Sequence, residues 1–329
     1  MWPVSGECAI GVDLGGTKMM AGVVDRELRV HARAQRPVPL DSQESILDSL
    51  VDIVAEARSA APIDPFAVGI GVPCLIDRTR DVAVLAVNLP LHDVDFRAVL
   101  GERLGLPVFV DNDANAAMVA EHRAGAARGA GHAAMLTIGT GIGGALLFDG
   151  NLYRGSLGAA GELGHMVVDE DGPPCQGNCP NHGCLESVAS GTALAREALR
   201  VARSVPDCAL GRALAAGRTI TGPLVTELAH DGDVAARDVV ALVGTRLGVG
   251  LANIVNMLCP EVIVIGGGVI GAGELLLAPA REVVRTRALP PSRDAVSIVR
   301  AHFGAESGML GAACLALDGM GEPASFGAG

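Results

Sequence analysis

The chain has 329 residues, half of them apolar, and a formal net charge of −12 at pH 7. This length allows two domains with a large core. Lys and Arg are scattered rather than clustered, which argues against a nucleic-acid or anionic-membrane partner. The longest apolar runs, around 134–148 and 262–273, are interrupted by Gly and Thr and are too short to span a membrane. The N-terminus lacks the pattern of a signal peptide, so we expect a cytoplasmic protein.

Residues 9–25 predict a β-hairpin in which a Gly-Gly turn joins two apolar strands. Backbone N–H groups at such a turn, with a hydroxyl and an ammonium group, suit phosphate oxygens, and an aspartate at the end of the first strand suits Mg²⁺. An ordinary hairpin turn has the same composition, and this segment alone does not decide between the two. The candidate nucleotide-binding residues here are Asp13, Gly15, Gly16, Thr17 and Lys18.

Four elements are expected next: a helix over 42–60 capped by Asp41 or Ser42, a buried strand over 66–76, a helix over 95–104 and a strand over 106–110. Gly71 and Asn88 lie in polar loops of this region and are candidate substrate-binding residues. We expect the five cysteines that are isolated in the sequence to be free thiols in a reducing compartment. These are Cys8, Cys74, Cys208, Cys259 and Cys314.

The sequence D-N-D-A-N at 111–115 follows the last of these strands and precedes a predicted helix over 114–127. Ligands of α/β proteins bind at the carboxyl ends of parallel strands. This position favours a role for Asn112 and Asp113 in substrate binding or catalysis. The alternative is that both side chains only cap the helix, and the two roles can coexist.

A second Gly/Thr hairpin is predicted over 134–149. A shift of 124 residues aligns Gly15-Gly16-Thr17 with Gly139-Thr140-Gly141 without a gap. The repeat predicts two related α/β domains with a nucleotide between their hairpins. The candidate nucleotide-binding residues of the second hairpin are Gly139, Thr140, Gly141 and Gly143.

The segment 158–186 combines three cysteines with many turn-forming residues. Cys175, Cys179 and Cys184 fall within ten residues, and His165 lies ten residues before the first of them. Three thiolates and one imidazole form a tetrahedral set that suits Zn²⁺. His182 is a competing fourth ligand, although only one residue separates it from Cys184. Alternatively, the thiols are neighbours by chance and His165 is a core histidine.

Glu162 and Glu186 flank this predicted zinc knuckle, which covers 165–186. A metal that fixes the loop would hold both carboxylates in place, as recognition of sugar hydroxyls requires. A closed Cys₃His shell has no open position, so the metal is expected to be structural. This order of residues predicts that loss of the metal weakens sugar binding much more than nucleotide binding.

The rest of the chain predicts helices over 190–215, 221–229, 236–258 and 274–287, strands ending at Gly266 and near 301, and a final helix over 308–317. We expect the final helix to return to the first domain. Strand, glycine-rich turn and helix succeed one another around 262–287, an arrangement that cradles nucleotides, here around adenosine. Gly266, Gly267 and Gly268 are the candidate residues.

Taken in order, these motifs resemble the ROK family of sugar kinases, bacterial glucokinases in particular, within the actin-like ATPase superfamily. The resemblance covers nearly the whole chain. It rests on D-L-G-G-T-K at 13–18, N-L-P at 88–90, N-D-A-N at 112–115, G-T-G-I-G-G at 139–144, A-G-E-L-G-H at 160–165, G-C-L-E at 183–186, A-S-G at 189–191 and I-G-G-G at 265–268.

The resemblance implies a two-domain α/β fold, a duplicated ribonuclease H-like architecture with an inserted zinc knuckle. The expected domains are 1–114 with 307–329, and 115–306. It implies ATP, Mg²⁺ and structural Zn²⁺ as cofactors, a homo-oligomer, and phosphorylation of glucose to glucose 6-phosphate. Asp113 is then the catalytic base, and Asn112, Glu162, His165 and Glu186 contact sugar hydroxyls, with His165 also binding zinc.

Three other activities remain open at this stage: an N-acetylhexosamine kinase, a polyphosphate-dependent glucokinase and a sugar-sensing regulator. The regulator is disfavoured because the first hairpin begins by residue 9, which leaves no room ahead of it for a DNA-binding motif. The chain also departs from the family pattern in its knuckle, where Gly177 and Pro180 replace a cysteine and a glycine and Cys175 is displaced by two residues. Cys74 and Leu91 are further departures that we expect to reshape the sugar pocket.

Overall fold

The computed structural model describes residues 7–78, 80, 82–86 and 89–319, and the chain divides into two compact units. The first unit comprises Met1–Arg128, Leu152–Ala160 and Glu306–Gly329. The second comprises Gly129–Asn151 and Gly161–Ala305. The first boundary lies after Arg128 rather than at 114, because the helix that follows the D-N-D segment packs on the C-terminal helix of the first unit.

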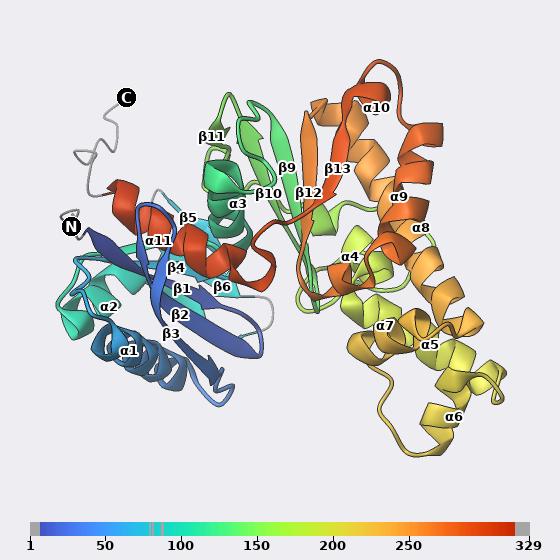
Figure 1. The fold of residues 1–329 in the computed structure, drawn as a ribbon, viewed down its shortest axis with the longest axis horizontal. Helices are drawn as coiled ribbons and strands as arrows, with labels where there is room; N and C mark the ends of the chain where they lie inside the picture. The colour runs from blue at the N-terminus through green and yellow to red at the C-terminus, as the bar shows by residue number, and fades with distance from the viewer. Residues whose placement is uncertain (1–6, 79, 81, 87–88, 320–329) are drawn as a thin grey trace. The chain divides into compact units, whose positions relative to one another are not determined.

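The first unit is built around a five-stranded sheet with the order β3-β2-β1-β4-β8 (Figure 1). β1 pairs with β2 in antiparallel orientation and with β4 in parallel orientation, and β4 and β8 are parallel. The elements are β1 (Cys8–Leu14), β2 (Lys18–Asp25), β3 (Val30–Pro37), α1 (Gln43–Ala60), β4 (Val68–Val72), β5 (Cys74–Asp77), β6 (Val82–Ala86), β7 (His92–Val94), α2 (Phe96–Leu104), β8 (Val108–Asn112), α3 (Asp113–Ala124) and α11 (Ser307–Gly319).

The second unit has a five-stranded sheet with the order β11-β10-β9-β12-β13, and helices gather on one side of it (Figure 1). β9 is antiparallel to β10 and parallel to β12, which is parallel to β13. The elements are β9 (Ala133–Ile138), β10 (Ile142–Phe148), β11 (Asn151–Leu152), η1 (Leu163–His165), α4 (Leu185–Ala189), α5 (Gly191–Ser204), α6 (Ala209–Ala215), α7 (Gly222–His230), α8 (Val234–Leu258), β12 (Val262–Gly266), η2 (Gly268–Ala272), α9 (Glu274–Arg287), α10 (Ser292–Ala295), β13 (Ser297–Arg300) and η3 (Gly304–Glu306).

Most elements lie where the sequence predicts them. Both Gly/Thr hairpins form, α1 is capped by Ser42, and α11 belongs to the first unit. The predicted strand over 66–76 was wrong as a single element: β4 ends at Val72, and after Pro73 the chain enters a separate three-stranded sheet, β5-β6-β7. The predicted helix over 190–215 is two helices, separated around Pro206.

Among the described residues, α8 is the one helix that is long and apolar enough to cross a membrane. More than half of its most apolar window is buried within the protein, at 61%. Its buried side chains belong to the core that β9, β12 and the helices of the second unit share. α8 is therefore the central core helix of that unit.

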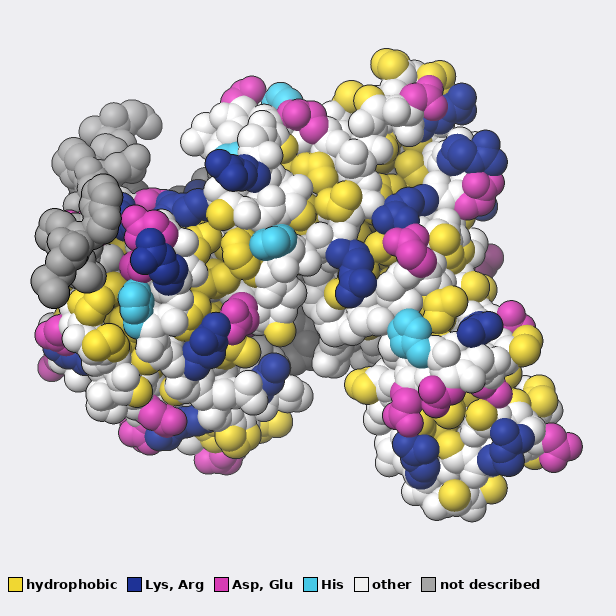
Figure 2. All heavy atoms as spheres, in the orientation of Figure 1, with side chains coloured by type: hydrophobic (Ala, Val, Ile, Leu, Met, Phe, Trp, Pro, Cys, Tyr) yellow, Lys and Arg dark blue, Asp and Glu magenta, His cyan; other side chains and the backbone are white. Residues whose placement is uncertain are grey.

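Acidic and basic side chains alternate on the face drawn in Figure 2, and the described residues form no continuous basic track there. Most ion pairs join exposed side chains of opposite sign, such as Arg58 with Asp64 and Arg285 with Glu282. Pairs of this kind contribute little to stability but keep the local charge mixed. The described part of the face drawn in Figure 2 therefore lacks the basic track along which a polyanion backbone binds.

In the first unit, α11 packs on the sheet with no side chain between the two backbones at two glycines. A Cβ placed on Gly69 of β4 would lie 1.7 Å from the carbonyl oxygen of Ala312, and one on Gly11 of β1 would lie 1.9 Å from that of Met309. A glycine at each position is therefore required for this close approach.

We predict that Gly69→Ala lowers the free energy of unfolding by about 3 kcal/mol or more and Tm by about 5 °C or more, because the helix must move away from the sheet. Thermal unfolding followed by circular dichroism measures the change. Gly101→Ala in α2 is the matched control, because there the nearest atom to an added Cβ is 3.7 Å away. A Gly69→Ala protein as stable as the control would contradict the close packing.

Candidate functional site

The carboxyl edge of the first sheet brings three predicted site segments side by side. Asp13 of β1 pairs with Gly71 of β4, and Gly71 pairs with Asp111 of β8. Because the three strands are parallel, the first hairpin, the Gly71 loop and the D-N-D-A-N segment end at one edge of the sheet. A Cβ on Gly71 would lie 3.3 Å from the Cα of Asp113, so the backbone at Gly71 packs closely against the start of α3.

The turn of the first hairpin is closed by its own backbone. The amide of Gly15 donates to the carbonyl of Lys18 at 3.0 Å, and the space over Gly16 is open to at least 4 Å. Burial raises the pKa of Asp13 to about 6, and the nearby Lys18 ammonium partly opposes the shift. A bound cation would compensate the charged carboxylate for the hydration that it loses on burial. Asp13 is therefore suited to hold Mg²⁺.

Asn112 and Asp113 begin α3. The Asn112 side chain accepts hydrogen bonds from the amides of Ala114 and Asn115, at 2.9 and 3.3 Å, and thereby caps the helix. The amide of Ala114 also donates to Asp113 Oδ1 at 2.9 Å. The positive end of the helix dipole stabilises the negative charge of the Asp113 carboxylate. The capping role is therefore present, and it fixes the orientation of Asp113 without excluding a catalytic role.

Asp111 is buried and forms an ion pair with Arg154, a partner that the sequence did not indicate. Arg154 Nε and Nη2 lie 2.8 and 2.6 Å from Asp111 Oδ2, and Asn115 Nδ2 donates to Oδ1 at 3.0 Å. Arg78 lies 3.7 Å from the same carboxylate. These bonds hold the segment before Asp113 to the loop around Arg154, and 43 residues separate the two partners in the sequence.

In the second unit, the second hairpin and the glycine-rich turn also share one sheet edge. Gly266 pairs with Thr137, just before the hairpin turn. Gly267 has φ +83°, and a Cβ there would lie 2.4 Å from the carbonyl oxygen of Ile138. The spaces over Gly139 and Gly268 are open to at least 4 Å. The two turns therefore present uncovered backbone beside each other, as phosphate and ribose recognition requires.

The four predicted metal ligands gather in one cluster. The ligand atoms of His165, Cys175, Cys179 and Cys184 all lie within 4.8 Å of one another. Cys175, which is displaced from the family pattern, is in the cluster, and His182 is not. Gly183 shapes the loop: its φ is +63°, its amide donates to Pro173, and its carbonyl accepts from Val168. The donor set fits a tetrahedral metal ion.

Burial raises the pKa of Cys175 and of Cys184, and neighbouring thiols contribute to both shifts. The raised pKa favours the neutral thiol at Cys175 and Cys184 when no metal is bound. A metal ion binds thiolates, so binding must displace protons and becomes weaker as the pH falls.

His165 has different neighbours at its two ring nitrogens. Nδ1 lies 3.5 Å from Cys175 Sγ, and Nε2 lies 3.8 Å from Glu162 Oε2. Burial raises the pKa of the Glu162 carboxyl, an imidazolium at His165 opposes the shift, and the charge of Glu186 adds to it. One side of the imidazole therefore faces the cysteines of the cluster, and the other faces the Glu162 carboxylate rather than open space.

Glu186 is 7% exposed, and one of its oxygens accepts a hydrogen bond from the amide of Ile142 at 2.7 Å. It thus connects residues 165–186, which carry the Cys₃His cluster and are called the metal loop below, to the second hairpin. The sequence did not indicate this contact. Cys74 and Leu91 are 3% and 1% exposed and belong to the core of the first unit, so neither side chain forms an open pocket wall. Asn88 lies outside the described residues.

The profile of the ROK family matches residues 9–319. The glucokinase of Streptomyces coelicolor is 35% identical over 313 residues, which cover 93% of this chain and 96% of that protein. The xylose repressor of Bacillus subtilis is 28% identical over 313 residues, which cover 94% of this chain and 77% of the repressor. A crystal structure of a ROK family glucokinase from Streptomyces griseus, in complex with glucose and AMPPNP, superposes with a TM-score of 0.86 at 36% identity, covering 94% and 99% of the two chains.

We predict that the purified protein carries one metal ion per chain and that Cys184→Ser removes it, because a hydroxyl is a poor substitute for a thiolate. Elemental analysis measures the content. Cys259→Ser, at an exposed cysteine outside the cluster, is the control and should retain the metal. The metal should also be released progressively as the pH is lowered, since protons compete for thiols whose pKa is raised. A metal-free wild-type protein would contradict the site.

Proposed function

Because this chain belongs to the ROK family, we propose that it is an ATP-dependent hexose kinase that phosphorylates the primary hydroxyl of glucose to give glucose 6-phosphate. The similarity to glucokinases over nearly the full length of both proteins supports the kinase activity. Glucose as the preferred hexose rests on the names of those relatives and on the complex of the Streptomyces griseus enzyme.

The observation that carries the proposal is the register of Asp13, Gly71 and Asp111 at one sheet edge, directly before Asp113. Phosphoryl transfer needs a carboxylate for the metal of the nucleotide and a base for the attacking hydroxyl, both held in fixed positions. In the proposed reaction Asp113 accepts the proton of the sugar hydroxyl as its oxygen attacks the γ-phosphoryl group. Mg²⁺, held near Asp13, would neutralise charge on the phosphate oxygens.

We assign the nucleotide to the two glycine hairpins. Two observations support this: each turn leaves backbone uncovered, and the two five-stranded sheets have the same strand order. In each sheet the hairpin supplies the central strand and its antiparallel neighbour, and two parallel strands follow on the other side. The shared order supports a duplicated, actin-like ATPase architecture. Gly266, Gly267 and Gly268 would then approach the adenosine.

We assign the sugar hydroxyls to the residues around the metal loop and at the start of α3. Asn112, Glu162, His165 and Glu186 offer the carboxylate, imidazole and amide groups that hydroxyls require. The metal is assigned as Zn²⁺, since three thiolates and one imidazole select a soft, tetrahedral ion. It would orient His165 and keep the loop folded.

A coupled assay tests the substrate. We predict the highest kcat/KM with glucose and ATP, and lower values with mannose, fructose, N-acetylglucosamine, N-acetylmannosamine and polyphosphate as donor. A higher kcat/KM for an N-acetylhexosamine would instead identify the protein as an N-acetylhexosamine kinase that uses the same phosphoryl-transfer reaction. Sugar binding without any turnover would favour a sensor, the function of the repressors in this family.

We predict that Asp113→Asn leaves zinc content and glucose affinity near those of the wild type and lowers kcat by about 100-fold or more, because an amide cannot accept the proton. Calorimetry and the coupled assay separate binding from turnover. Asp41→Asn, the same change on the exposed loop before α1, is the control and should be fully active. A residual kcat above about a tenth of the wild-type value is incompatible with general-base catalysis by Asp113.

A further inference from the structure

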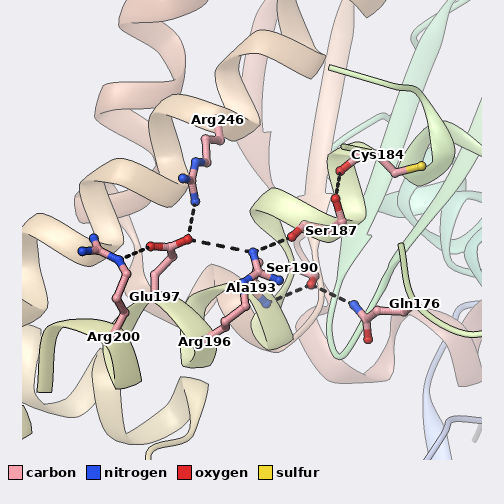
Figure 3. A network of polar contacts seen from close by, with 9 residues as sticks. All are labelled: Gln176, Cys184, Ser187, Ser190, Ala193, Arg196, Glu197, Arg200 and Arg246. Carbon is pink, nitrogen blue, oxygen red and sulfur yellow. Dashed lines mark hydrogen bonds and ion pairs between the residues drawn. The ribbon is translucent and has the colours of Figure 1, made fainter. Parts of the chain in front are cut away.

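The metal loop contacts the turn of the second hairpin through one side chain. Gln176, the residue after the ligand Cys175, donates from Nε2 to the carbonyl oxygen of Thr140 at 3.3 Å and to Ser190 Oγ at 3.2 Å. Figure 3 shows the amide of Gln176 directed toward Ser190. The Thr140 carbonyl accepts a second hydrogen bond from Thr192 Oγ1 at 2.8 Å.

Two further hydrogen bonds attach the same turn to the end of the metal loop and to the segment that follows it. The amide of Gly191 donates to the carbonyl of Gly139 at 2.8 Å, and Glu186 accepts from the amide of Ile142 at 2.7 Å. The carbonyl groups of Gly139 and Thr140 are therefore held by donors from 176–192. A carbonyl oxygen directed at a phosphate would repel it, so fixing these carbonyls fixes which polar groups the turn presents to an anion.

The segment from Cys184 to Glu197, which contains Ser190, Gly191 and Thr192, is well anchored. Ser190, which is fully buried, caps α5 by accepting from the amide of Ala193. Nearby, the Ser187 hydroxyl donates to the carbonyl of Cys184, and Arg196 donates to the carbonyl of Ser187 (Figure 3). Glu197 then pairs with Arg200 and Arg246 on α5 and α8. Thr192, one of the two side-chain donors to Thr140, thus lies in a well-anchored segment, and Gln176 is hydrogen-bonded to that segment through Ser190.

We infer that Gln176 is a positioning residue for the phosphate turn Gly139–Gly141, so that the metal loop supports nucleotide binding as well as the sugar site. The inference rests on the proposed kinase function and deepens it. It reverses the expectation from the sequence, in which the metal loop and the nucleotide turns are independent. The residues are 36 positions apart, and no motif joins them.

The test uses Gln176→Ala in the metal-loaded protein, with zinc content, AMPPNP affinity and glucose affinity measured separately. Losing both hydrogen bonds should raise the dissociation constant for AMPPNP about three- to tenfold and KM for ATP by a similar factor. Zinc content and glucose affinity should stay within about twofold of the wild type, since Gln176 is neither a ligand of the cluster nor an assigned sugar contact.

Three further variants separate positioning from a general disturbance of the loop. Gln176→Glu keeps the size of the side chain but removes its donor, and it should weaken AMPPNP binding at least as much as Gln176→Ala. Asn178→Ala alters an exposed residue of the same loop and should leave all three measurements unchanged. Thr192→Val removes the other side-chain donor to Thr140, and its effect should not add fully to that of Gln176→Ala, because both act on one carbonyl group.

The outcomes are distinguishable. Unchanged AMPPNP affinity in Gln176→Ala, with a wild type that binds both ligands, overturns the inference and leaves the proposed function intact. Loss of zinc or of glucose binding in Gln176→Ala also overturns it, since the residue would then act on the whole loop. A wild-type protein that binds neither glucose nor AMPPNP overturns the proposed function and this inference together.

Discussion

The parallel register of β1, β4 and β8 is the constraint on which the first unit depends. It aligns Asp13, Gly71 and Asp111 across three strands, and so brings the Asp13 carboxylate beside the segment that begins α3. A register shift of one residue would direct each side chain to the opposite face of the sheet. The glycines that admit α11 next to β1 and β4 are part of the same constraint, because the helix packs against the strands that carry these residues.

The two units hold their Gly/Thr turns in different ways. Their sheets have the same strand order, and each places a Gly/Thr turn between its first two strands. In the first unit an aspartate lies beside that turn, whereas in the second unit Thr137 occupies the corresponding position and the turn is held by the metal loop. The first turn thus lies beside the carboxylate of Asp13. The second turn has no such carboxylate at the corresponding position, and hydrogen bonds to its carbonyl groups define its conformation.

The sequence predicts those features that are local or repeated. The two hairpins share a gapless spacing, and α1, α3 and α8 have clear periodicity and caps, so their positions follow from the chain alone. The gathering of His165 with Cys175, Cys179 and Cys184 was predicted from the spacing of these four residues. The small sheet β5-β6-β7 was not predicted from the sequence. Its strands have only three to five residues, and β5 follows the strongly apolar strand β4 directly after Pro73, so the two were predicted as one strand. The membership of α3 in the first unit was not predicted either, because it is decided by the packing of α3 on α11.

Contacts between polar side chains that are far apart in the chain could not be predicted from the sequence either. Asp111 and Arg154 have no periodic relation, and a buried ion pair has no signature in a single sequence. The same holds for Gln176, which in the sequence is one of several polar residues in a loop rich in turns. In the structure it lies between Cys175 of the Cys₃His cluster and the turn of the second hairpin. A metal that orders this loop would therefore order Glu162, His165 and the Thr140 turn together, and groups assigned to the sugar and to the nucleotide would share one rigid support. Such preorganisation lowers the entropic cost of bringing two substrates into reactive geometry. A metal bound at this cluster would then contribute to the reaction without taking any chemical part in it.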